Sequence, residues 1–194
     1  TEDYPTTQID NGKTGKCVKL ETRLTGDLGN MVGMPIAAGN LFIGSFDMLN
    51  AITNPLSATR FGTPFYNKPL RLTGYYKYKA GEQFYENGEY TSRKDIFNIY
   101  TIFYDGVKYD SAGKGTDVTL DGNLPNQNYE HSSMVALALV SNPQETEGDE
   151  WKFFDIPFDY QRYGKKIDEA RLAKGEYKIC LLYTSDAADD RISV

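Results

Sequence analysis

The chain has 194 residues, with 21 basic and 27 acidic side chains and a formal net charge of −6. Nucleic acids and anionic membranes bind basic surfaces, so this charge argues against both as partners. The length suffices for one domain with a sizeable core, and the longest apolar run, Met134–Val140, is too short to insert into a membrane.

Strand patterns recur along the first half of the chain and are separated by Gly, Pro, Asn and Asp. The segment Lys16–Leu24 alternates between apolar and charged side chains, Asn40–Asp47 is a short apolar run, and Leu70–Lys79 alternates again. Asp95–Tyr104 is apolar on both faces. That pattern is typical of a central strand that is buried on both sides.

Further strands are expected in the second half, over Thr116–Leu120, Ser133–Val140, Trp151–Tyr160 and Glu176–Ile179. Only Asp168–Lys174 has a helical pattern, and we expect one short turn of helix there. About eight strands with turns at short spacing predict an all-β fold, a jelly-roll β-sandwich of antiparallel strands.

The end of the chain matches a DNA sequence of a different origin. Residues 180–190 read Cys-Leu-Leu-Tyr-Thr-Ser-Asp-Ala-Ala-Asp-Asp, which is one translated frame of a transposase-based sequencing-library adapter. Residues 191–194 fit the index that follows such an adapter. Segments added by processing are set aside in fold reasoning. We therefore expect a metagenomic fragment with a single domain over residues 1–179, a non-native tail over 180–194, and a C-terminally truncated sandwich that lacks its last strand. The alternative is that Tyr177–Thr184 is a real strand.

An ordered set of short motifs resembles a known family. The motifs are Leu41–Phe46, Asn54–Pro55, Phe61–Phe65, Pro69–Leu70, Leu72–Tyr78, Gly81–Glu82, Asp95–Ile96, Ile99–Tyr100, Leu120–Gly122, Met134–Ala136 and Trp151–Tyr160. The set resembles the putative carbohydrate metabolism domain (PCMD) family and covers most of residues 16–179. The resemblance implies a jelly roll similar to carbohydrate-binding modules. It also implies an exported protein with further domains, at the cell surface or in the periplasm of a Gram-negative bacterium.

The aromatic content, with 15 Tyr, 10 Phe and 1 Trp, suits both a β-rich core and a sugar-binding surface. If Leu72 faces the core, Tyr75 points outward together with Arg71 and Lys77. The candidates for binding a polysaccharide or oligosaccharide are Tyr75, Tyr66, Tyr85, Tyr90, Trp151, Arg71 and Lys77, and Tyr129 is a further ring expected to be exposed. The alternative is that these rings pack at the rim of the core and that Trp151 covers it as a lid.

Carboxylates in a Gly-rich stretch suggest a structural calcium ion as the one possible cofactor. The candidate ligands are Asp105, Asp110, Asp117 and Asp121. Turn formation explains the same residues, and their spacing does not match the helix–loop–helix calcium motif. One His, and one Cys outside the tail, leave little material for other metal sites or for a Cys/His nucleophile pair.

No residue is assigned a catalytic role. Asp155 and Asp159 share a strand face but would lie about 13 Å apart at the rise of a strand. Glycoside hydrolysis needs two carboxyl groups about 5–10 Å apart. The sequence therefore predicts a non-catalytic carbohydrate-binding or accessory module of an exported surface protein that handles glycans. The alternatives are a glycoside hydrolase or another glycan-active enzyme, and a structural or adhesion module.

Overall fold

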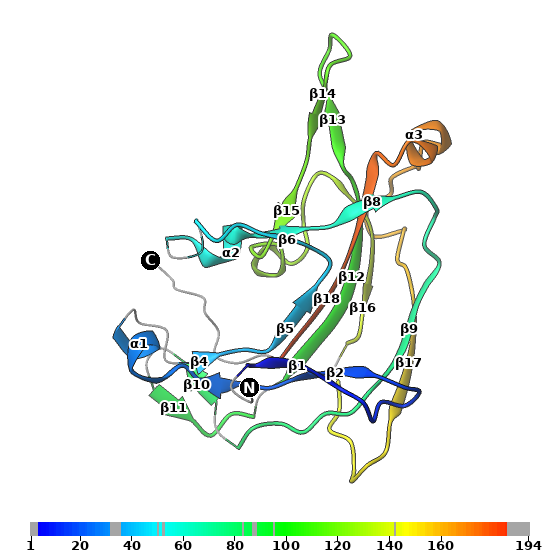
Figure 1. The fold of residues 1–194 in the computed structure, drawn as a ribbon. Coiled ribbons are helices and arrows are strands. Elements are labelled where there is room, and N and C mark those ends of the chain that lie inside the picture. The colour runs from blue at the N-terminus through cyan, green and yellow to red at the C-terminus, as the bar shows by residue number, and fades with distance from the viewer. Residues whose placement is uncertain are drawn as a thin grey trace.

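Two long strands form the centre of the fold (Figure 1). The strands β12 (Phe97–Asp105) and β18 (Tyr177–Ser185) pair antiparallel along their whole length, and β16 (Met134–Leu139) pairs with the other edge of β12. The structure is a computed structural model that describes residues 4–31, 36–49, 51, 53–82, 84–86, 89–94, 96–141 and 143–185. The described part is mostly β, and its paired strands are antiparallel, as the sequence predicted.

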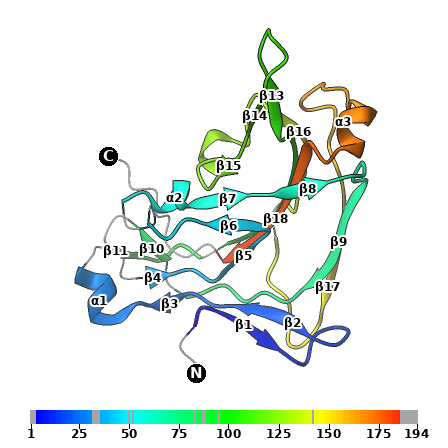
Figure 2. The ribbon, with the colours of Figure 1, turned by 45° about the horizontal axis from the view of Figure 1, so that its top comes forward.

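The second edge of β18 is shared by two shorter strands (Figure 2). The strand β8 (Thr63–Phe65) pairs with its first residues and β5 (Asn40–Phe42) with its later ones. Between these pairings the two segments leave β18. There they pair with each other as β6 (Gly44–Phe46) and β7 (Thr59–Phe61). Gly62 lies at this branch with φ +98°, a conformation that favours glycine.

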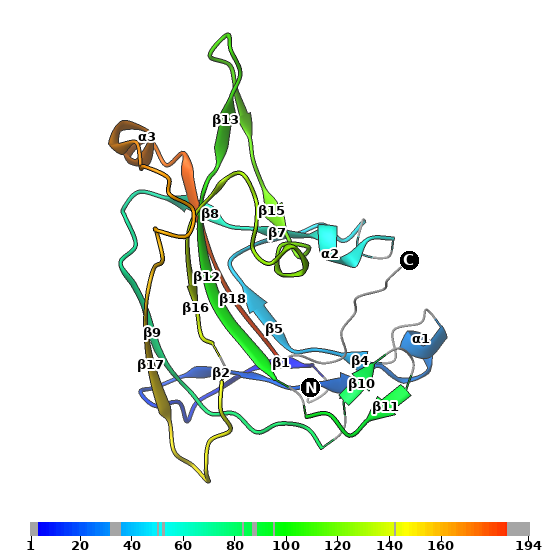
Figure 3. The ribbon, with the colours of Figure 1, turned by 180° about the vertical axis from the view of Figure 1, so that it is seen from behind.

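Other strands cover the central sheet on both faces, as seen from behind in Figure 3. The ribbon of β9 (Arg71–Tyr76) and β17 (Lys152–Pro157) packs on one face through Tyr76, with Phe97 and Ile99 on the sheet side. On the other face, β7 and β15 (Leu120–Asp121) supply Phe61 and Leu120, which pack against the rings and aliphatic chains of β12 and β18. The central strands are therefore buried on both sides, as the apolar pattern of residues 95–104 predicted.

The remaining elements lie around this core. They are the hairpin of β1 (Thr6–Ile9) and β2 (Cys17–Leu20), the pairs β3 (Arg23–Leu24) with β4 (Ile36–Ala37), β10 (Phe84–Glu86) with β11 (Glu89–Thr91) and β13 (Val107–Tyr109) with β14 (Gly115–Asp117), and the short helices α1 (Gly26–Met31), α2 (Pro55–Ala58), η1 (Pro125–Gln127) and α3 (Glu169–Ala173). The helix expected at Asp168–Lys174 is α3, which begins after Asp168 because the Asp168 side chain accepts from the N–H groups of Ala170 and Arg171.

The expectation of a missing last strand is wrong. Residues 180–185 form the second part of β18, which pairs with β12 on one edge and with β5 on the other. Their side chains alternate, so that Cys180 and Leu182 join one core while Leu181 and Tyr183 pack on the other face. Strand formation depends on this alternation and not on the origin of the codons. The adapter origin of residues 180–194 stays a hypothesis, and residues 186–194 lie outside the described part of the chain.

Candidate functional site

The ribbon of β9 and β17 turns one face to the core and the other to water. Leu72, Gly74 and Tyr76 turn toward the core, and the residues between them are exposed. This alternation is expected for a strand with one solvated face. The Tyr75 side chain is 48% exposed, which confirms that it points outward. We name the solvated side the outer face of the ribbon.

Aromatic rings gather on this outer face. Tyr75 of β9 and Phe153 of β17 are partners in the strand register, and their ring centroids lie 5.1 Å apart at an interplanar angle of 49°. Phe153 is 54% exposed. Trp151 lies two residues before Phe153, just ahead of β17, and is half-buried. We name Tyr75, Trp151 and Phe153 the ring row. Large apolar groups that a fold leaves together in water often mark a binding surface.

Charged side chains flank the ring row at one end. Lys77 Nζ lies 5.0 Å from the centroid of the Trp151 ring and 3.0 Å from Asp149 Oδ1. Lys13, in the turn between β1 and β2, places its Nζ 5.6 Å from the centroid of the Tyr75 ring. Both ammonium groups are near enough for attraction to the π-systems. This end of the row therefore combines flat apolar surfaces with hydrogen-bond donors and an exposed carboxylate.

A second polar pair lies at the other end. Arg71 Nε is 2.5 Å from Asp155 Oδ1, and this hydrogen bond raises the pKa of the Arg71 guanidinium above its ordinary value. The exposed Thr73 is the register partner of Asp155. These side chains add a hydroxyl, a guanidinium and a carboxylate to the outer face, beside the rings. They are the groups that can bond the hydroxyls of a sugar.

Two adjacent hollows lie beside the outer face, between β2 and β9. The larger has a volume of about 450 Å³, and the lining includes Tyr75 and Trp151. The smaller has a volume of about 290 Å³ and shares Leu20, Lys77 and Tyr183 with the larger. Burial raises the pKa of Tyr183 to about 12, so its hydroxyl stays protonated at neutral pH. We name the two hollows together the β2–β9 groove.

The predicted sugar-binding residues separate into two groups. Tyr75, Arg71, Lys77 and Trp151 come together at the outer face and the β2–β9 groove. The other rings lie elsewhere in the fold. This group comprises Tyr66 after β8, Tyr90 in β11, Tyr85 in β10 and Tyr129 after η1.

Exposure differs within the second group. Tyr66 and Tyr90 are 58% and 55% exposed. Tyr85 is the register partner of Tyr90, and its side chain lies outside what the structure describes. Tyr129 differs from the expectation because it is half-buried, with its ring 5.0 Å from that of Tyr100 in an edge arrangement. Burial raises the pKa of Tyr129 to about 12, so this ring belongs to the rim of the core.

Sequence reasoning missed Phe153, which completes the ring row. Its signal was present, because Trp151, Phe153 and Asp155 share one side of an extended chain. What the sequence did not show is that β17 pairs with β9 in a register that places Phe153 opposite Tyr75. Lys13 was also missed, since only the position of the β1–β2 hairpin brings it to the Tyr75 ring.

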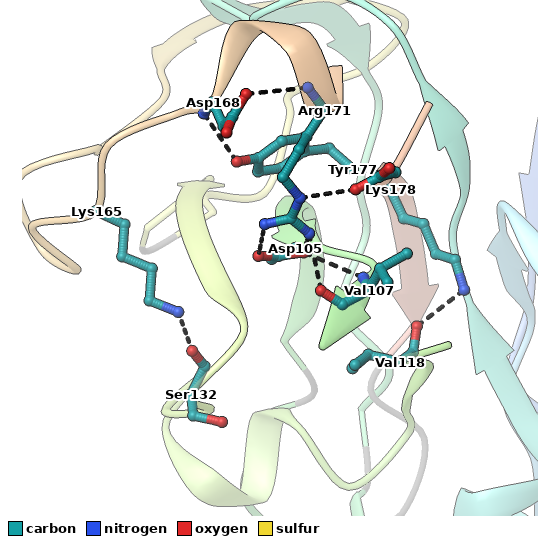
Figure 4. A network of polar contacts seen from close by, with 10 residues as sticks. Asp105, Val107, Val118, Ser132, Lys165, Asp168, Arg171, Tyr177 and Lys178 are labelled. Atoms are coloured by element: carbon teal, nitrogen blue, oxygen red, sulfur yellow. Dashed lines mark hydrogen bonds and ion pairs between the residues drawn. The ribbon is translucent and has the colours of Figure 1, made fainter. Parts of the chain in front are cut away.

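Two of the aspartates considered for calcium are held by basic residues, and Figure 4 shows one of them, Asp105, with Arg171. Arg171 donates to both carboxylate oxygens of Asp105, over 2.8 and 2.5 Å, and to the Val107 carbonyl oxygen over 2.8 Å. The hydrogen bonds to Asp105 raise the pKa of the Arg171 guanidinium above its usual range. Lys178 Nζ lies 2.7 Å from Asp117 Oδ1. Asp105 therefore ties the base of the β13–β14 hairpin to α3, and Asp117 ties the hairpin itself to β18.

The other two aspartates shape turns. Asp110 accepts hydrogen bonds from the backbone N–H groups of Ala112 and Lys114, and Asp121 accepts one from Asn123. In the part of the chain that the structure describes, no group of three or more His, Cys, Asp or Glu side chains is placed to hold a metal ion. Turn chemistry therefore accounts for these carboxylates.

The two carboxylates weighed for hydrolysis also have partners. Asp155 lies on the outer face in its pair with Arg71. Asp159 accepts hydrogen bonds from the backbone N–H groups of Gln161 and Arg162, each over 3.0 Å. Asp159 therefore forms the turn after β17.

Comparison with known proteins gives one family and two similar structures. The sequence profile of the putative carbohydrate metabolism domain matches residues 1–193. A putative glycoside hydrolase from Bacteroides vulgatus is 52% identical, with a TM-score of 0.84, over 94% of this chain and 68% of the other. A putative glycoside hydrolase from Bacteroides thetaiotaomicron is 48% identical, with a TM-score of 0.81, over 94% of this chain and 50% of the other. No curated protein matches the chain.

The fold and the outer face define a mostly β, antiparallel domain with an exposed aromatic surface beside a groove of mixed apolar and polar lining. The chain belongs to the putative carbohydrate metabolism domain family, which confirms the resemblance seen in its motifs. It spans about two thirds of one similar structure and half of the other. Among the described residues, no helix is both long and apolar enough to cross a membrane.

Proposed function

We propose that the chain is a non-catalytic carbohydrate-binding module that holds a glycan on the outer face of the β9–β17 ribbon. The observation that carries this proposal is the ring row, in which Tyr75 and Phe153 are about half exposed and lie 5.1 Å apart. Flat rings cover the apolar C–H faces of sugars at a low cost in side-chain entropy. Membership in a carbohydrate metabolism family supports the same ligand class.

The surroundings of the ring row suit hydroxyl groups. Lys77 and Asp149 lie at one end, and Arg71 and Asp155 at the other, each pair within hydrogen-bond distance. Ion pairs this exposed contribute little to folding, so their donors and acceptors can be shared with a ligand at small cost. A saccharide stacked on the rings would place its equatorial hydroxyls within reach of such groups.

The module belongs, in this proposal, to an exported glycan-handling protein at the surface or in the periplasm of a Gram-negative bacterium. Its sandwich is of the jelly-roll kind, which the two covered faces of the central sheet support. Contact with other domains of a longer protein is supported by the apolar side chains of Ile43 and Phe46, which are 41% and 53% exposed. These exposed side chains also favour the structural or adhesion role as an additional one.

A glycoside hydrolase is the second candidate function. It is favoured by the description of both similar structures as putative glycoside hydrolases. The two candidates differ in a measurable product, because a hydrolase releases new reducing ends from its polysaccharide and a binding module does not. Release that scales with the amount of purified protein would replace the non-catalytic proposal with this one.

Native affinity gels that contain soluble glucan, mannan, xylan or galactan test the binding proposal. We expect at least one polysaccharide to retard the protein without releasing reducing ends. Tyr75→Ala and Phe153→Ala should each weaken that binding by about tenfold or more, equivalent to about 1.4 kcal/mol. Tyr90→Ala is the matched control, because it removes an equally exposed ring outside the ring row.

Circular dichroism and thermal unfolding establish that each variant is folded. Retardation that survives both ring substitutions, or that Tyr90→Ala abolishes to the same degree, would place the binding surface elsewhere. No retardation by any polysaccharide in the panel would remove the binding function itself.

A further inference from the structure

We infer that the outer face and the β2–β9 groove bind an internal stretch of an extended, uncharged polysaccharide, and not a chain end or a single sugar. This inference rests on the proposed function and names the class of its ligand.

The polar and aromatic groups of the outer face are arranged in a line. In the register of β9 and β17, Arg71 lies opposite Pro157, Thr73 opposite Asp155, and Tyr75 opposite Phe153. Lys77 and Trp151 continue the same order, since Lys77 Nζ lies over the indole ring. Each step of two residues advances about 6.6 Å, so the line from position 71 to position 77 covers about 20 Å. One sugar ring cannot contact groups spread over that length.

Both ends of this line are open to water. The Arg71 side chain is 51% exposed at one end, and the Asp149 side chain is fully exposed at the other. The two hollows of the groove have Leu20, Lys77 and Tyr183 in common among their lining residues, so both reach the Lys77 end of the line. A surface that is open at both ends lets a chain pass through, whereas a pocket closed at one end selects a terminal sugar.

Two neutral ion pairs lie along the line. Arg71 is bonded to Asp155 and Lys77 to Asp149 on the outer face, so each pair offers donors and acceptors without net charge. The neighbouring surface adds positive charge, because Lys13 lies over the Tyr75 ring and the Glu21 carboxylate is shared by Lys19 and Arg23. An uncharged chain of hydroxyl-bearing sugars fits the two neutral pairs, whereas a polyuronate would have to compete with their carboxylates.

Oligosaccharides of two to six units, prepared from the polysaccharide that retards the protein most, test the inference by calorimetry. We expect the affinity for the hexasaccharide to exceed that for the disaccharide by about tenfold or more, with the gain coming from added contacts along the line. Reduction of the chain end with borohydride should leave the affinity within about twofold. Polygalacturonate should bind less tightly than the neutral chain.

Variants at the two ends of the line sharpen the test. Arg71→Ala and Lys77→Ala should each weaken hexasaccharide binding several-fold, and at least one of them should leave disaccharide binding unchanged, because a short ligand cannot reach both ends. Lys166→Ala, an exposed lysine before α3, is the control and should change neither.

Several results would overturn the inference. Affinity that is already maximal for a disaccharide, or that end reduction abolishes, would show that the site binds a chain end or a short unit. Tighter binding of polygalacturonate, lost as sodium chloride is raised, would show a preference for charged chains. In each of these cases the binding function would still stand. Failure of all saccharides to bind would instead overturn the proposed function and this inference together.

Discussion

The strands β12 and β9 carry aromatic rings in opposite ways. Phe97, Tyr100, Phe103 and Tyr104 of β12 are each no more than 1% exposed. β9 pairs with β17 on one edge and has one face in water, so its Tyr75 is half-exposed. The rings of β12 stabilise the fold because both faces of their sheet are covered. The difference shows that the layer in which a strand lies, and not its aromatic content, decides whether a ring is core or surface.

Neighbouring residues in β9 show the same contrast at the smallest scale. Tyr76 is 4% exposed and packs its ring 4.8 Å from that of Phe97, while the adjacent Tyr75 is 48% exposed. Successive side chains of a strand point to opposite faces. A ribbon of two strands can therefore anchor itself to the sheet with one set of rings and present the other set to a ligand.

The largest expected effect on stability comes from removing a buried ring of β12. Phe103→Ala removes a fully buried ring that stacks 5.4 Å from Tyr177 of β18. We expect the free energy of unfolding to fall by about 3–5 kcal/mol, because the removed ring leaves a cavity between two packed layers. Denaturant unfolding followed by fluorescence measures this change.

Phe103→Leu is the matched control, since it keeps most of the apolar volume and should cost clearly less than the alanine variant. A loss below about 1 kcal/mol for Phe103→Ala would contradict the placement of β12 at the centre of the fold.

The sequence predicted these two strands because each has a strong local pattern. Leu70–Lys79 alternates and contains β9, and Asp95–Tyr104 is apolar on both faces and contains β12. The helix α3 was likewise predicted from a short apolar segment that begins with its own cap, Asp168. The outward direction of Tyr75 followed from alternation alone.

Pairings between distant segments could not be read from local patterns. The ring row depends on β17 meeting β9 in one register, and about 80 residues separate Tyr75 from Phe153 along the chain. At Gly62 the chain changes partner, because β7 before it pairs with β6 and β8 after it pairs with β18. The sequence marks this change only by the glycine. The match to an adapter sequence led us to expect no native strand over residues 180–185, whereas their apolar run Cys180–Tyr183 suits a strand that is buried on both faces.

A smaller effect is expected from the thiol at the centre of β18. Burial raises the pKa of Cys180 from 9.0 to about 12. Below pH 9 the thiol is protonated in both states. Above pH 9 the unfolded chain loses this proton while the folded chain keeps it, so the free energy of unfolding falls as the pH rises toward 12. At pH 10 this group alone should account for about 1 kcal/mol of the loss.

Cys180→Ala removes the titrating group and should flatten this part of the stability profile between pH 8 and pH 11. Cys17→Ala keeps the buried thiol and should follow the unchanged chain. Buried tyrosines such as Tyr183, whose pKa is also raised, lower the stability of all three proteins from about pH 10 upward. Identical profiles for the two variants would show that Cys180 is not buried as the structure places it.

The smallest expected effect on stability comes from removing a ring of the outer face. Phe153→Ala removes a ring as large as that of Phe103 from a position that is 54% exposed. Its packing in the fold includes the contact with Tyr75, so we expect a loss of no more than about 1 kcal/mol in the free energy of unfolding. The same substitution should weaken polysaccharide binding by about tenfold. A large loss of stability would show that Phe153 serves the fold. A small loss of stability together with weakened binding would show that this exposed ring serves the ligand.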